Sequence, residues 1–95
     1  MGDAGLVTVV LPGPLRARAG NQRAVTVVGR TVREVIGALD QAYPGLGFNL
    51  CYETGELRQY VNIFVDGEEV RRLAGLDTPV MAGSRLHVLP SVAGG

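Results

Sequence analysis

The end of the sequence carries the residues with the most distinctive chemistry. The chain closes on a pair of glycines, which can extend through a channel that is too narrow for any other residue because they lack Cβ atoms. We expect Gly95 to carry the free α-carboxylate, which has a usual pKa of about 3.5 and is a poor acyl donor when ionised. Conversion to an acyl adenylate would make this carboxyl group reactive. A frayed and inert terminus is the alternative interpretation. The tail consists of Ser91, Val92, Ala93, Gly94 and Gly95.

Two further side chains could take part in chemistry, Cys51 and His87, and each is the only one of its type. A single thiol cannot form a disulfide framework within the chain, and a single histidine cannot form a cluster with metal-binding spacing. We therefore interpret Cys51 as a passive, half-buried residue and His87 as a surface residue. A persulfide on Cys51, or a role of His87 as a base, is the alternative. We expect no catalytic residue, no metal site and no bound cofactor.

Composition narrows the class of protein. A length of 95 residues predicts one domain, and a hydrophobic content of 46% allows a small core without disulfides. Nine arginines, with no lysine, balance nine acidic residues, so there is no electrostatic basis for binding nucleic acid or an anionic membrane. Neither a signal peptide nor an apolar stretch of bilayer-spanning length is recognisable, and we expect a cytoplasmic protein.

Elements that could position the tail follow from the hydrophobic pattern. Thr31–Tyr43 is predicted to be a helix, because Thr31 and Glu34 can form a capping box and apolar residues recur at helical spacing. Gly37, inside this helix, suggests close packing against the sheet. Asp66-Gly67 predicts a hairpin turn, residues 12–23 a long loop and residues 46–51 a short helical turn. The predicted strands are Leu6–Leu11, Ala24–Val28, Tyr60–Val65, Glu68–Arg71 and Arg85–Leu89.

This order of elements predicts an α+β domain of the β-grasp type. We expect a mixed sheet of four to five strands with one main helix packed on one face, formed by residues 1–90. The last strand should run parallel to the first in the middle of the sheet, and Pro90 should end it. Residues 91–95 are then expected to form a flexible tail that projects from the end of a central strand.

Strand alternation also predicts an exposed apolar patch beside the tail. If Leu86 and Val88 face the helix, the residues between and after them face away from it. Such a patch on a small protein indicates an interaction surface. The residues expected on it are Val10, Phe64, His87 and Leu89.

Nearly the whole chain resembles the bacterial ubiquitin-like sulfur carriers of the MoaD/ThiS type. The best local matches are residues 61–67, with the sequence VNIFVDG, and residues 89–95, with the sequence LPSVAGG. Among these proteins the actinobacterial carrier of cysteine biosynthesis is the most similar. The small subunit of molybdopterin synthase typically has a second proline where this chain has Ser91, which weakens the resemblance to that subunit.

The resemblance implies that the chain is a protein co-substrate. An adenylyltransferase that resembles the ubiquitin-activating enzyme would use ATP to adenylate Gly95, a persulfide would convert it to a thiocarboxylate, and a biosynthetic enzyme would accept the sulfur. It also implies that the apolar position of Leu89 lies at the partner interface. Three other functions stay open: the small subunit of molybdopterin synthase, a covalent modifier joined to lysines, and an interaction module with an inert tail.

Overall fold

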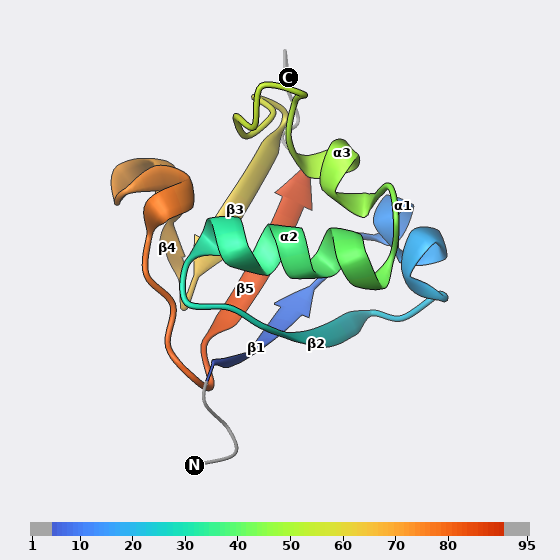
Figure 1. The fold of residues 1–95 in the computed structure, drawn as a ribbon, viewed down its shortest axis with the longest axis horizontal. Coiled ribbons are helices and arrows are strands. Elements are labelled where there is room, and N and C mark those ends of the chain that lie inside the picture. Colours follow the sequence, from blue (N-terminus) through green and yellow to red (C-terminus); the bar gives the residue numbers. More distant parts are fainter. Residues whose placement is uncertain (1–4, 91–95) are drawn as a thin grey trace.

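A mixed sheet with one long helix across one of its faces forms the body of the computed structural model, which describes residues 5–90 (Figure 1). The sheet has five strands in the order β2-β1-β5-β3-β4. β1 and β5 are parallel, and the other neighbouring pairs are antiparallel. This arrangement confirms the predicted β-grasp architecture. The strands are β1 (Leu6–Val10), β2 (Ala24–Val28), β3 (Val61–Val65), β4 (Glu68–Glu69) and β5 (Arg85–Pro90).

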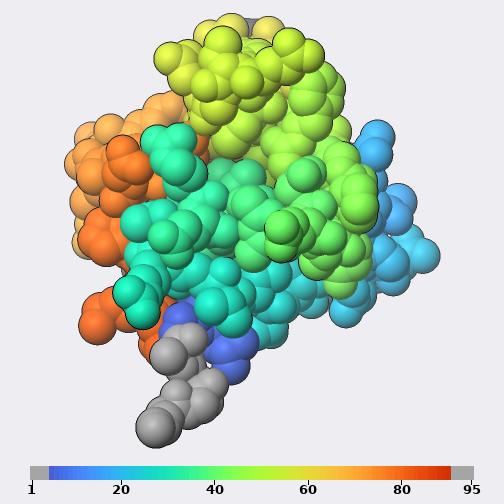
Figure 2. Space-filling model, viewed as in Figure 1, coloured from blue at the N-terminus to red at the C-terminus, as the bar shows by residue number. Residues whose placement is uncertain are grey.

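The core lies between the sheet and helix α2 (Val32–Ala42). Along each central strand every second side chain is buried, as the alternation predicts, because successive residues point to opposite faces. Seen from the helix side, α2 and α3 (Leu46–Leu50) cover the sheet (Figure 2). On the opposite face of the sheet, Val10, Phe64 and His87 are half-buried and Leu89 is exposed, and no helix formed by residues 5–90 packs over them. The largest fully buried side chains are Leu11, Leu39, Leu46, Leu50, Ile63 and Leu86.

The start of α2 is fixed by reciprocal side-chain caps. Thr31 Oγ1 accepts a hydrogen bond from the backbone N–H of Glu34 at 3.1 Å. The Glu34 carboxylate accepts one from the backbone N–H of Arg30 at 2.9 Å, one residue further back than in the usual capping box. The predicted helix start is therefore confirmed.

The interpretation of Gly37 as a close-packing residue is wrong. A Cβ atom at this position would meet no atom within 4 Å, because Gly37 lies on the exposed side of α2. Close packing occurs instead at Gly29, where the chain passes from β2 to the helix. A Cβ there would lie 2.8 Å from Val35 Cγ2 and 2.9 Å from the Val35 backbone nitrogen.

The expected long loop after β1 is also wrong, because residues 13–19 form two short helical turns. These are α1 (Gly13–Arg16) and η1 (Ala17–Ala19). Pro14 lies in the first turn of α1, where its fixed φ suits a helix and its missing N–H costs nothing. The Arg16 side chain holds the turn by donating a hydrogen bond from Nε to the Leu11 carbonyl at 3.0 Å.

The connections on the other side of the sheet differ from expectation in strand length and in two helical turns that were not predicted. Asp66 and Gly67 both have positive φ, 49° and 94°, and form the predicted two-residue turn. The returning strand ends at Glu69, two residues early, because Val70 turns into the core. It is followed by η2 (Val70–Arg72) and η3 (Gly75–Asp77). Strand β5 continues one residue further than predicted, through Pro90.

Candidate functional site at the end of the central strand

Strand β5 determines where the chain leaves the domain. It lies between β1 and β3, with Val9 opposite Leu86 on one side and Ile63 opposite Val88 on the other. Leu86 and Val88 are almost fully buried under α2. Residue 90 is therefore positioned by its pairing with Val61 of β3, and the pairing with β1 ends three residues earlier, at His87. The predicted tail, from Ser91 through Val92, Ala93 and Gly94 to Gly95, lies outside the described residues.

The structure brings together the four residues predicted to form the apolar patch. Val10 and Phe64 are the direct cross-strand partners of His87, on either side of it. Leu89 lies two residues further along β5 on the same face and is 45% exposed, whereas the other three are half-buried. The face is the one opposite α2. Partner binding by this patch stays a prediction.

An apolar pocket at the base of the tail was not predicted. It has a volume of about 210 Å³ and is bordered by both surfaces of the end of β5, through Val88 on the helix side and Leu89 on the other. The remaining wall comes from α1, α3 and the start of β3. The sequence predicts a loop for residues 12–14, and the helical turn of α1 brings Pro12 and Pro14 to this pocket. The lining residues are Pro12, Pro14, Leu15, Asn49, Arg58, Tyr60, Val61, Val88, Leu89 and Pro90.

Arg58 lies on the rim of this pocket between two aromatic rings. Its guanidinium carbon is 4.7 Å from the centre of the Phe48 ring and 4.8 Å from that of Tyr52, distances typical of cation–π contacts. Arg58 Nε donates a hydrogen bond to the Phe48 carbonyl at 2.8 Å. The spacing of these residues in the sequence gave no sign of the contact, because it depends on how the chain turns after α3.

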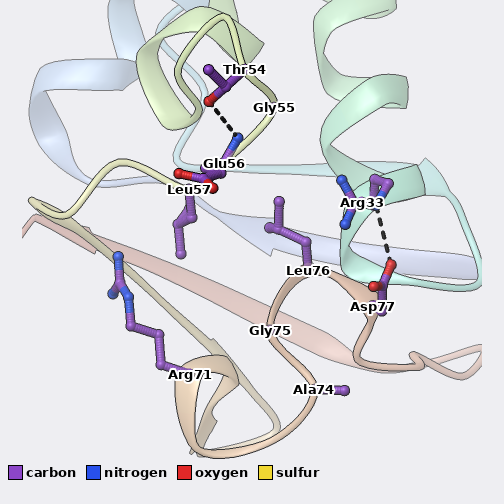
Figure 3. Close-up of a pocket in the computed structure, with 10 residues that line it drawn as sticks. All are labelled: Arg33, Thr54, Gly55, Glu56, Leu57, Arg71, Ala74, Gly75, Leu76 and Asp77. Carbon is purple, nitrogen blue, oxygen red and sulfur yellow. Dashed lines mark hydrogen bonds and ion pairs between the residues drawn. The ribbon is translucent and has the colours of Figure 1, made fainter.

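A larger hollow of about 620 Å³ lies between α2, the loop after α3 and the segment after β4 (Figure 3). Its two arginines are engaged with protein atoms. Arg33 Nε pairs with Asp77 Oδ1 at 3.1 Å, and Arg71 donates hydrogen bonds to the carbonyls of Val61 and Arg58 at 2.9 and 2.8 Å. These contacts join neighbouring segments of the fold. We therefore assign Arg33 and Arg71 a structural role and not a role in ligand binding.

Cys51 has the surroundings of an unreactive thiol. It is partly buried, and this burial raises the pKa of the Cys51 thiol, against smaller opposing effects of the Arg33 and Arg58 charges. At neutral pH the group is therefore protonated, whereas the thiolate is the nucleophile. These surroundings agree with the passive interpretation. Within residues 5–90 no three His, Cys, Asp or Glu side chains are grouped so that they could hold a metal ion. No helix in that range is long and apolar enough to cross a membrane.

Comparison with known proteins identifies the family. Residues 9–95 match the model of the ThiS family. The sulfur carrier protein CysO of Mycobacterium tuberculosis is 40% identical over 91 residues, which cover 94% of this chain and 98% of that protein. The small archaeal modifier protein 3 of Haloferax volcanii is 40% identical over 65 residues, which cover 68% of this chain and 70% of that protein.

The fold comparison agrees. The crystal structure of the Amycolatopsis orientalis BexX/CysO complex contains a chain that superposes with a TM-score of 0.87 at 37% identity, over 94% of this chain and 99% of that chain. These matches show that the chain belongs to the ThiS family of ubiquitin-like β-grasp proteins and is a homologue of the sulfur carrier protein CysO.

Proposed function

We propose that this protein carries sulfur as a thiocarboxylate on Gly95 and delivers it for the biosynthesis of cysteine or a sulfur-containing metabolite. The observation that supports the proposal is the position of β5. A central strand, held on both sides, leads directly into a tail that ends in two glycines, in a chain of the ThiS family. Such an arrangement lets a rigid body present its terminus to the active site of another protein.

The proposed reaction takes place entirely at the terminal carboxyl group. The Gly95 carboxylate attacks the α-phosphate of ATP, which releases pyrophosphate and gives an acyl adenylate. The terminal sulfur of a persulfide then attacks the acyl carbon and displaces AMP. A second thiol cleaves the resulting S–S bond, which leaves the thiocarboxylate on Gly95 and a disulfide between the two thiols. In this proposal the partner enzyme binds the ATP, and we expect the reaction to take place in the cytoplasm.

Two partner proteins follow from this chemistry: an adenylyltransferase that resembles the ubiquitin-activating enzyme, and a biosynthetic enzyme that accepts the sulfur. A five-residue tail alone buries too little surface for a specific complex, so the folded body must also be recognised. The patch of Val10, Phe64, His87 and Leu89 is suited to this role, because it is largely apolar, lies on the sheet face that the described helices leave open, and includes residues of the strand that leads to the tail. The BexX/CysO complex is a precedent for a protein partner of a homologue.

The test is intact-protein mass spectrometry of the chain after incubation with the adenylyltransferase, ATP and a persulfide source. We expect a mass gain equal to the exchange of one oxygen for one sulfur, and we expect none for a chain that lacks Gly95. Cys51→Ser is the matched control and should gain the same mass as the unaltered chain. Sulfur uptake by the truncated chain at its new terminus, or its loss in Cys51→Ser, would overturn the proposal.

The similarity to a small archaeal modifier protein favours one further candidate, covalent attachment to other proteins. The same acyl adenylate would then be attacked by a lysine amine, which forms an isopeptide bond and releases AMP. Immunoblots of cells that express an epitope-tagged chain distinguish the two fates. Bands shifted by the mass of the chain, absent when Gly94-Gly95 is deleted, would support modification, whereas free thiocarboxylate alone would support sulfur transfer.

A further inference from the structure

The base of the tail presents a surface with an unusual concentration of exposed aromatic and apolar side chains. Phe48 is 57% exposed and Tyr60 53% exposed, although burial of either ring would be favourable. Tyr60 and Arg58 line the apolar pocket at the end of β5, and the Phe48 ring adjoins it through its contact with Arg58. We refer to this set as the tail-base surface, and it consists of Pro12, Pro14, Phe48, Arg58, Tyr60 and Pro90.

Arg58 is held in place before any partner binds. Its backbone N–H donates to the Leu50 carbonyl at 2.9 Å, and its own carbonyl accepts from Arg71 at 2.8 Å and from the Val61 N–H at 3.0 Å. The guanidinium is fixed by the Phe48 carbonyl and by the rings of Phe48 and Tyr52. A charged side chain that is already ordered loses little conformational entropy on binding.

Among the described residues, no acidic side chain forms an ion pair with Arg58. Glu53 and Glu56 line the groove on the Tyr52 side of the guanidinium, but within residues 5–90 neither forms an ion pair with it. Arg33 and Arg71, in contrast, are each paired with a carboxylate. The tail-base surface therefore combines an apolar pocket with one fixed cation that forms no ion pair with an acidic side chain of residues 5–90.

We propose that the tail-base surface is a second docking site for the adenylyltransferase, in addition to the patch on the outer face of the sheet. It receives a loop that carries an apolar side chain next to a carboxylate. The apolar side chain enters the 210 Å³ pocket between Pro14 and Val88, and the carboxylate pairs with Arg58. This inference rests on the proposed function, because it takes the enzyme that encloses the tail as the partner.

Proximity to the tail is the reason for choosing this partner. Pro90 is both the last residue of β5 and part of the pocket wall. Consecutive residues of an extended chain are about 3.5 Å apart. The surface of a protein that encloses residues 91–95 must therefore lie within a few ångströms of the pocket. The pocket is lined by Val61 and Val88, which point to the helix side of the sheet, whereas His87 and Phe64 point to the other side. An enzyme that contacts both the pocket and the outer-face patch therefore binds β5 from both faces of the sheet.

The test measures pyrophosphate release by the purified adenylyltransferase of the source organism as a function of carrier concentration. Arg58→Glu places a negative charge opposite the expected carboxylate and should raise KM about tenfold or more, since it disrupts a charge pair and a neighbouring pocket. kcat should stay within about twofold, because the tail and its carboxyl group are unchanged. Tyr60→Glu, in the same pocket wall, should raise KM in the same direction.

Arg30→Glu is the matched control, because it makes the same charge change between β2 and α2, at the end of the sheet away from the tail (Figure 1). Its KM should equal that of the unaltered chain. Circular dichroism and the thermal midpoint of each variant establish that it is folded at the assay temperature. If Arg58→Glu and Tyr60→Glu are folded and keep an unaltered KM, the docking site is refuted while the proposed function stands. Absence of pyrophosphate release with the unaltered chain refutes the proposed function and, with it, the docking site.

Discussion

Leu89 offers the sharpest test of the outer-face patch, because its side chain can be changed without disturbing the core. It is 45% exposed, next to the end of β5, and it lies on the face opposite α2. We predict that Leu89→Asp leaves the fold intact and weakens binding of the adenylyltransferase.

The size of the effect follows from this exposure. Full burial of a leucine side chain is worth about 1.5–3 kcal/mol, so burial of the exposed 45% in a complex contributes about 1 kcal/mol. The new carboxylate must also be desolvated in the complex, which costs roughly 1–3 kcal/mol more when it finds no partner. The sum corresponds to a dissociation constant about 30-fold to 1,000-fold higher.

Isothermal titration calorimetry with the purified enzyme measures this change. Met81→Asp is the matched control, since Met81 is 75% exposed and lies in the turn before β5, away from the tail. Its affinity should equal that of the unaltered chain. Unchanged affinity of Leu89→Asp, with a native circular dichroism spectrum, would refute the assignment of this face to partner binding.

Three further predictions concern the body of the protein. Gly37→Ala should raise the free energy of unfolding by up to about 1 kcal/mol in denaturant titrations. Alanine has a higher helix propensity than glycine, and the added methyl group meets open space. A lower stability would show that the position is more crowded than the structure indicates. Thr31→Ala should lower the free energy of unfolding by about 1 kcal/mol, because the backbone N–H of Glu34 loses its hydrogen-bond acceptor. Thr31→Ser keeps the hydroxyl group and should retain most of this stability. Because burial raises the pKa of the Cys51 thiol, alkylation by iodoacetamide should increase with pH at a higher midpoint in the folded chain than in urea. A lower midpoint in the folded chain would indicate an activated thiol.

Local patterns in the sequence were sufficient to predict the framework of the sheet and the helix. The alternation of buried and exposed residues in Val61–Val65 and Arg85–Pro90 is visible in the sequence, because every second residue must face the core. The cap at Thr31 and the turn at Asp66-Gly67 depend on residues that are adjacent or nearly adjacent in the chain. The outer-face patch followed directly from the same alternation.

Features that depend on contacts between distant segments were missed. Gly29 and Gly37 are indistinguishable by type, and only the path from β2 into α2 shows that Gly29 is the crowded one. Arg71 joins the segments around Val61 and Arg58 through three-dimensional proximity alone. The helical turn at Gly13–Arg16 has one usable signal, the proline near its first position, but prolines are also common in loops, and the sequence analysis predicts a loop for residues 12–23.

The central claim is that sulfur is carried by the terminal carboxyl group and that the folded body takes no part in the chemistry. The most direct measurement is peptide mapping by tandem mass spectrometry of the chain purified from its own cells, after alkylation traps any thiocarboxylate or persulfide. We predict that the transferable sulfur is found on the peptide that ends at Gly95. Sulfur on the peptide that contains Cys51, with an unmodified carboxyl group at Gly95, would contradict the account.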